Sequence, residues 1–333
     1  MEKKLFGKLP CGCEVNTYTL KNENAELVLM DRGATIVSFK VFGKDIVGGF
    51  DTIEDYLKDN SHQGATIGRV ANRIADAQFT MDGAVYMVTE NDHGNCLHGG
   101  DGFDHKMWSV TDTTDNSITF GYVSADGEEG FPSELEVEVT FTLEGTAVRI
   151  DYKAVPHGKT PIALTNHSYF NLDGFGDTVK GHVAMIYANN YTEVNDKLIP
   201  NGNRPDVKGT VFDFTEPHTI GERIGGEFKG YDHNFVLAPT VKRDFDGKEL
   251  GLAAEVSGKE LKMSVYTDQP GVQFYIGNFL GNGPDFKGSV KPVKHGAFCL
   301  ETQTEPNCIN SGTGFYQEGD VYTHTVVYEI GKV

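Results

Sequence analysis

Three histidines lie in stretches where polar and aromatic residues are densely mixed, which is unusual for a plain β-core. They are His98 in residues 95–100, His167 in residues 164–172 and His233 in residues 231–235. Aromatic faces can cover the C–H surfaces of a ligand, while amides, acids and imidazoles bind its hydroxyl groups. The three stretches are therefore typical of a sugar pocket, although most of the 11 histidines are expected only to pack or to face water.

A lone carboxylate, Glu301, follows an apolar run in residues 298–303. A glutamate at the end of a buried strand is costly unless it is paired or functional. From this window alone, the favoured interpretation is a side chain that turns to solvent on the polar face of the strand. A role in acid or base chemistry is the alternative.

Two arginines, Arg69 and Arg73, stand among apolar residues in the segment 67–74. Surface charges on a loop, or structural ion pairs, explain such arginines more often than substrate binding does. Gln273 lies within an aromatic strand in residues 269–275, where a position on the exposed face is the default. None of these three residues points to a site by itself.

Two other chemistries stay open at this level. Two histidines and a carboxylate could bind non-haem iron, but the histidines are far apart and form no H-x-H or H-E-x-x-H pattern, so the metal hypothesis is weak. Asp232 and Glu301 could be the carboxylate pair of a glycosidase, and the sequence gives no distance between them. The chain has neither a P-loop nor a dinucleotide-binding glycine pattern.

The elements that must position these residues are short strands. Apolar and polar residues alternate over residues 135–143, which predicts a strand with one buried face, and the alternation over residues 148–152 predicts its hairpin partner. Similar segments are expected at residues 26–30, 35–41, 78–88, 108–112, 117–123, 182–188, 250–266, 272–278, 297–301 and 322–330. Thr52 is the N-cap candidate of a short helix. The pattern predicts an all-β, mostly antiparallel sandwich with a few short helices, formed by residues 1–333 as one domain.

The composition narrows the possible partners. The formal net charge is -19, which disfavours nucleic acid and anionic membranes. The 5 cysteines are irregularly spaced and are expected to be reduced thiols, as in a cytoplasmic protein. The first nine residues do not have the pattern of a signal peptide, and no apolar stretch is long enough to cross a bilayer.

Taken together and in order, these windows resemble the aldose 1-epimerase (galactose mutarotase) family. The resemblance spans almost the whole chain and rests on residues 6–7, 18–22, 33–38, 49–51, 67–74, 97–100, 102–104, 165–172, 231–234, 269–279 and 294–303. Residues 304–314 depart from the family pattern, in which an acidic loop containing proline and histidine follows the Glu-Thr-Gln segment. The departure concerns the expected rim of the pocket and therefore the fine specificity.

The resemblance implies a fold, an activity and a role for each matched residue. The fold is a large galactose mutarotase-like β-sandwich, and the activity is interconversion of the α and β anomers of free aldoses such as galactose and glucose, without cofactor or metal. The implied general base is Glu301 and the implied general acid is His167. The other matches are His98 near the ring oxygen, and the residues that hold sugar hydroxyls: Asn72, Arg73, Asp232 and Gln273. A non-catalytic sugar-binding protein on the same scaffold is the competing interpretation.

Overall fold

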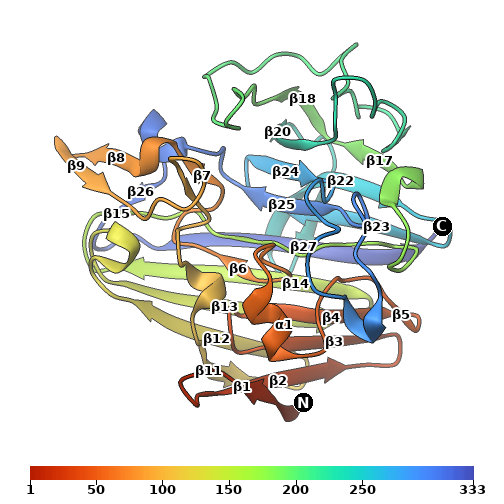
Figure 1. Cartoon of the computed structure of the whole chain (residues 1–333), viewed down its shortest axis with the longest axis horizontal. Coiled ribbons are helices and arrows are strands. Elements are labelled where there is room, and N and C mark those ends of the chain that lie inside the picture. Colours follow the sequence, from red (N-terminus) through yellow and green to blue (C-terminus); the bar gives the residue numbers. More distant parts are fainter.

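The computed structural model describes residues 1–333, and strands dominate it (Figure 1). Every ladder between its strands is antiparallel. The largest sheet has ten strands, and nine of them follow one another in the order β11 (Ser109–Thr113), β12 (Ser117–Ser124), β13 (Leu135–Glu144), β14 (Ala147–Pro156), β27 (Tyr322–Lys332), β23 (Leu261–Thr267), β22 (Lys248–Ser257), β17 (Val183–Ile186) and β19 (His218–Thr219). The tenth, β21 (Lys242–Phe245), pairs with β22. The predicted antiparallel β architecture is confirmed.

Two smaller sheets complete the main layers. The N-terminal sheet contains, in order, β1 (Glu2–Lys8), β2 (Glu14–Lys21), β3 (Ala25–Met30), β4 (Thr35–Val41) and β5 (Lys44–Asp45). The four-stranded sheet contains β18 (Ala188–Tyr191), β20 (Asp232–Leu237), β24 (Gly271–Tyr275) and β25 (Cys299–Gln303). In Figure 1, β1 and β2 lie at the bottom of the view and β18 and β20 at the top. One apolar cluster of 53 buried residues draws side chains from all three sheets, so this cluster is the core of the sandwich.

Alternation in the sequence explains the long strands. Leu135, Val137, Val139, Phe141 and Leu143 are all buried along β13, and the residues between them are more exposed. The strand pairs with β14 over its full length, from Leu135 opposite Pro156 to Glu144 opposite Ala147. The predicted hairpin is therefore confirmed.

Short strand pairs and turns connect the layers. The two-residue pairs are β6 (Thr66–Ile67) with β16 (Thr165–Asn166), β7 (Arg73–Ile74) with β10 (Cys96–Leu97), and β15 (Thr160–Pro161) with β26 (Phe315–Tyr316). The segment 78–88, predicted as one strand region, is the hairpin of β8 (Gln78–Met81) and β9 (Ala84–Met87). The 3₁₀ turns are Ala75–Ala77, Phe103–His105, Glu128–Gly130, Val179–Gly181, Lys287–Ser289 and Cys308–Ser311.

The single α-helix, α1 (Ile53–Lys58), begins where the sequence predicts. The Thr52 side chain accepts a hydrogen bond from the backbone N–H of Asp55, as an N-cap does. None of the helices is long and apolar enough to span a membrane. All five cysteines are free.

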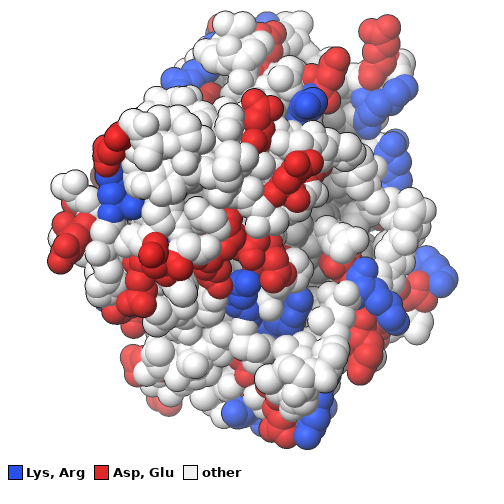
Figure 2. Space-filling model, turned by 60° about the vertical axis from the view of Figure 1, so that its left-hand side comes forward, with Lys and Arg blue, Asp and Glu red and all other residues white.

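The surface carries both signs of charge. Figure 2 shows a face on which acidic side chains form a band across the middle, with lysine and arginine side chains next to it. No large basic area is visible on that face.

Candidate active site

Six of the seven predicted site residues line one pocket of about 140 Å³, against the roughly 30 Å³ of one water molecule. The six are Asn72, Arg73, His98, His167, Asp232 and Glu301. The seventh, Gln273, lies directly behind the wall and donates from Nε2 to Asp232 Oδ1 at 2.7 Å. The structure therefore brings together residues that are more than 200 positions apart in the chain.

The four-stranded sheet supplies the acidic wall of the pocket. Gln273 on β24 stands opposite Glu301 on β25, so these two side chains are cross-strand neighbours on one face. Glu301 is only 2% exposed, and its Oε2 has no hydrogen-bond partner in the protein. The favoured interpretation from its sequence window, a side chain turned to solvent, is wrong. Gln273 is also buried, so the default expectation of an exposed position fails for the same reason: the face is covered by loops that are distant in sequence.

The short strand pairs supply the basic wall. Pairing of Arg73 with Leu97 places Asn72 and His98 side by side. The backbone N–H of His98 donates to Asn72 O at 3.0 Å, and the backbone N–H of Asn72 donates to His98 Nδ1 at 3.2 Å. Because Nδ1 accepts this bond, the hydrogen of the neutral ring sits on Nε2, which is free to donate to a ligand.

The backbone at this place is itself unusual. Asn72 and His98 have φ angles of 60° and 55°, in the left-handed region that few residues other than glycine adopt. Gly99 follows at φ 82°, and a Cβ there would lie 2.3 Å from the carbonyl oxygen of Gly68. Such conformations cost energy and cluster at functional sites.

Arg73 and Arg69 have different roles. Arg73 donates from Nε to Asp92 Oδ2 at 2.7 Å and lines the pocket. Arg69 points away from the pocket and is 2% exposed. Its guanidinium donates to the carbonyl oxygens of Ser124, Ala125, Pro132 and Ser133 and to the hydroxyls of Ser124 and Thr160. Neither arginine is the exposed loop charge that was one interpretation of this segment.

His167 and Glu301 lie close together in the pocket. His167 Nε2 and Glu301 Oε1 are 3.7 Å apart. Burial raises the pKa of Glu301 well above its usual range, and the charge of Asp232 adds to this rise while that of Arg73 opposes it. Burial also lowers the pKa of His167 to about 3. Both shifts favour the uncharged forms of the two side chains, which places the exchangeable proton of the pair on the carboxyl group.

Three of these side chains could also hold a metal ion. One ligand atom from each of His98, His167 and Glu301 lies within 4.8 Å of the other two. Two histidines and a glutamate are a ligand set that catalytic zinc uses. Proton transfer between these side chains requires them to be equally close, so the same distances fit a metal site and an acid/base site. Addition of a chelator to an activity measurement distinguishes the two.

Several pocket residues were not predicted from the sequence. Asn60, Ser61 and His62 come from the segment between α1 and β6, where a run of polar residues is the only sequence signal. Tyr169, Tyr275 and Phe279 provide aromatic surface near the centre. Residues 304–314, expected at the rim, do not line the pocket. Asn307 instead bonds to the backbone of Arg73 and Ala75.

The third singled-out histidine, His233, lies outside the pocket. Its Nδ1 accepts from the backbone N–H of Asp232 at 3.2 Å, and its ring packs on Phe212 with centroids 4.5 Å apart. It therefore supports the strand that carries Asp232.

The fold and the pocket together define a β-sandwich protein with a buried histidine–glutamate pair in a small polar cavity. The family model described as aldose 1-epimerase matches residues 16–329. The galactose mutarotase of Sus scrofa is 40% identical, with 97% of this chain and 96% of that protein aligned. The aldose 1-epimerase of Escherichia coli (strain K12) is 32% identical, with 96% of each chain aligned. A solved aldose epimerase homologue from C. elegans superposes with a TM-score of 0.87 at 26% identity, covering 96% of this chain and 99% of its own.

The chain belongs to the aldose 1-epimerase family. It is an enzyme of the carbohydrate isomerase kind, with mutarotase activity on small sugar molecules.

Proposed function

We propose that this pocket interconverts the α and β anomers of free galactose or glucose by opening and reclosing the sugar ring, without a cofactor or a metal ion. The observation that carries the proposal is the buried Glu301–His167 pair, 3.7 Å apart in a pocket lined by hydrogen-bonding groups. The names of the relatives, galactose mutarotase and aldose 1-epimerase, support the same reaction.

The reaction moves two protons at neighbouring oxygens. Ring opening removes the proton of the C1 hydroxyl and adds one to the ring oxygen, and both oxygens are bonded to C1. An acid and a base a few ångströms apart can therefore reach both. In our proposal, Glu301 accepts the hydroxyl proton while His167 protonates the ring oxygen, and the two exchange roles when the ring closes on the other face.

The proton count of the pair fits this cycle. The pair carries one proton throughout: on His167 before opening and on Glu301 while the chain is open. The uncharged distribution that burial favours is thus the one required with the open-chain sugar. A bound cyclic sugar must favour the ion pair, and the positive charge of Arg73, which lowers the pKa of Glu301, acts in that direction.

The remaining residues would bind hydroxyl groups. His98 offers its Nε2 hydrogen, Asp232 offers carboxylate oxygens, and Arg73 retains donors beyond its bond to Asp92. Gln273 Oε1 is buried without a partner and holds Asp232 in place through its amide nitrogen. Asn72 accepts from the backbone N–H of Arg73 and completes this wall.

The test measures anomer exchange of galactose by NMR, comparing the native chain, Glu301→Gln, His167→Asn and buffer. We expect the native chain to accelerate exchange, and each variant to lose a factor of about 10² to 10⁴ in kcat, the usual contribution of a positioned acid or base. Addition of EDTA should change nothing, because no metal takes part. Near-native activity of Glu301→Gln would overturn the assignment of the base. If galactose binds in calorimetry but no exchange occurs, the chain is only a sugar-binding protein.

Two further parts of the proposal concern the domain organisation and the location of the protein. We infer that residues 1–333 act as one domain, since one apolar cluster contains side chains from β2 to β27. The five free cysteines support a cytoplasmic location.

A further inference from the structure

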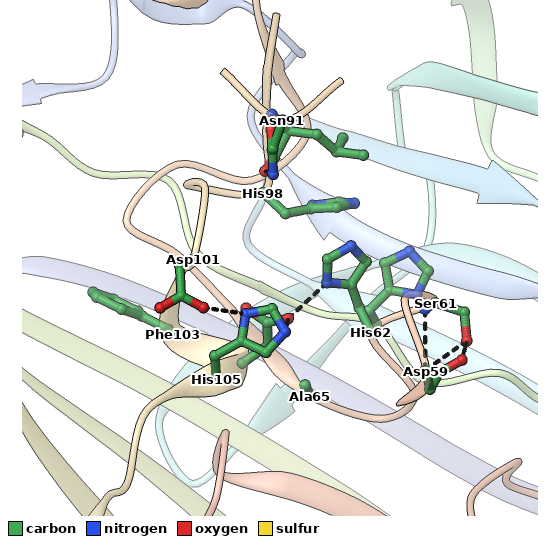
Figure 3. Close-up of polar contacts among 12 residues, drawn as sticks. Asp59, Ser61, His62, Ala65, Asn91, His98, Asp101, Phe103 and His105 are labelled. Atoms are coloured by element: carbon green, nitrogen blue, oxygen red, sulfur yellow. Dashed lines mark hydrogen bonds and ion pairs between the residues drawn. The ribbon is translucent and has the colours of Figure 1, made fainter. Parts of the chain in front are cut away.

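A third histidine, His62, stands at the pocket beside the two predicted ones. Its ring lies edge-on to that of His98 with centroids 4.7 Å apart, and 5.8 Å from that of His167 (Figure 3). It is one of the residues that line the pocket. The segment that carries it, between α1 and β6, contributes no residue to the acid/base pair described above.

A buried carboxylate fixes the orientation of this ring. His62 Nδ1 lies 2.7 Å from Asp104 Oδ2, and the Asp104 side chain is only 4% exposed. Burial alone would raise the pKa of Asp104, but the charge and hydrogen bond of His62 outweigh it and lower the pKa, so the group is a carboxylate. A carboxylate only accepts hydrogen bonds, so His62 Nδ1 carries a hydrogen and donates it.

The nitrogen that remains is Nε2, and no protein group forms a hydrogen bond with it. In Figure 3, the ring of His62 lies next to that of His98, and a dashed line marks the contact of His62 with its own carboxylate partner. We propose that His62, oriented by Asp104, is a sugar-binding residue of this pocket and forms a hydrogen bond to one substrate hydroxyl through Nε2. The inference rests on the proposed function, because it assumes that a sugar occupies the pocket.

The two neighbouring histidines offer opposite groups to a ligand. His98 Nδ1 accepts a backbone hydrogen, so its Nε2 donates. His62 Nδ1 donates, so its Nε2 accepts while the ring is neutral and donates when the ring is charged. A sugar hydroxyl can do both, so the contact holds in either state. Burial disfavours the charged ring, but the carboxylates of Asp104 and Asp59 outweigh burial and raise the pKa of His62.

The alternative is that His62 only stabilises the fold through its pairing with Asp104. A neighbouring histidine that pairs with the same carboxylate provides the control. His105 Nε2 lies 3.5 Å from the same Asp104 oxygen, and its Nδ1 lies 2.9 Å from Asp101 Oδ1, yet His105 does not line the pocket. Replacing His105 disturbs the same carboxylate without removing a group from the pocket wall.

The experiment combines replacement of the His62 side chain with removal of single hydroxyl groups from the sugar. Anomer exchange is measured by NMR for galactose and its 2-, 3-, 4- and 6-deoxy derivatives, with the native chain, His62→Phe and His105→Phe. We expect His62→Phe to raise KM for galactose about five- to a hundredfold, the usual range for one lost hydrogen bond, with kcat changed less than about threefold. For one deoxy sugar, the variant should add almost no further penalty, because the partner hydroxyl is already missing. His105→Phe should leave every KM near the native value.

Equal penalties on galactose and all four deoxy sugars, or a loss confined to kcat, would overturn the assignment. Circular dichroism shows whether His62→Phe folds. If it does not, the same comparison of galactose with its deoxy derivatives is made with His62→Gln. Calorimetric binding of the same sugars supplies a second readout. A native chain that binds galactose without exchanging its anomers would refute the proposed reaction, while the binding cycle would still decide the role of His62.

Discussion

The core of the sandwich and the wall of the pocket are formed by neighbouring strands, but they differ in the polarity of the side chains that they bury. In the core, 53 buried residues form one apolar cluster, and the strand ladders pair the backbone groups. At the pocket, Glu301 Oε2 in the wall and Gln273 Oε1 directly behind it are buried without hydrogen-bond partners. The ladder β13–β14 packs apolar side chains toward its buried face, whereas β24 and β25 direct Gln273 and Glu301 to theirs.

Because of this difference, we expect the core to determine stability and the pocket wall to determine function. A buried polar atom without a partner costs about 1–3 kcal/mol. Glu301 Oε2 lies in the pocket wall, where the hydroxyl-rich molecule of the proposed function would satisfy it. Substitutions in the core should therefore change stability with little direct effect on turnover, and substitutions in the wall should do the reverse.

The largest effect within this comparison is expected for Phe141→Ala in β13. Phe141 is fully buried and meets Phe120 edge-on, so the substitution leaves a cavity and should lower the free energy of unfolding by about 3–5 kcal/mol. Urea denaturation at 25 °C measures it. Val123→Ala on the neighbouring strand, at a side chain that is 54% exposed, is the control and should change stability by less than about 0.5 kcal/mol. The separation fails if Phe141→Ala loses as much kcat as Glu301→Gln under conditions where it is folded.

A smaller effect, of the opposite kind, is expected for Asp232→Ala. The proposed hydroxyl contacts of Asp232 would exist in both the bound and the transition state, so KM should rise about ten- to a hundredfold while kcat stays within a few-fold. Burial raises the pKa of this carboxyl, so the folded state holds its charge at a cost that offsets the loss of the hydrogen bond from Gln273 Nε2, and the free energy of unfolding should change less than in Phe141→Ala. Steady-state kinetics and urea denaturation on the same sample test both statements. A pure loss of kcat would contradict the binding role.

The third effect concerns acid, and it joins the two regions. Burial lowers the pKa of His167 in the pocket to about 3 and that of His324 in the ten-stranded sheet to about 4. A folded-state pKa below the unfolded value of about 6.5 means that the unfolded chain binds more protons at that histidine, so the stability that each histidine contributes is complete above pH 6.5 and falls as the pH drops below it. Each histidine should contribute a slope of about 1.4 kcal/mol per pH unit between pH 6 and 4.

Urea denaturation across this pH range measures the slope, and His167→Asn should reduce it by the share of one histidine. His324 is the core counterpart: it bonds Thr302 and stacks on Tyr152. A slope that is unchanged in His167→Asn would mean that the pocket histidine titrates alike in the folded and unfolded chains.

The same contrast explains what the sequence could predict. Alternation over residues 135–143 defines β13, because half of that strand faces the core and half faces away. The strands that place His98 and His167 have only two residues each, too short for any periodic pattern. Resemblance to a family, rather than pattern, placed Asn72, Arg73, Asp232 and Gln273 near the pocket.

Partners that are distant in sequence could not be derived in this way. Asp92, the partner of Arg73, and Asp104, the partner of His62, carry no local signal, since each acts through a side chain 19 or 42 positions away. Glu301 is buried among pocket residues that are distant in sequence, so its own apolar window could not distinguish a solvent-facing side chain from a buried one.

Arg69 has a consequence for protein engineering. Its guanidinium joins the segment before Asn72 and Arg73 to residues 124–133 and to Thr160 through bonds to four carbonyl oxygens and two hydroxyls. The segment 66–74 therefore cannot be exchanged for that of a relative on its own. A chimera that imports residues 66–74 from a relative must import the matching carbonyl cradle as well, because a buried guanidinium without its acceptors would destabilise the host.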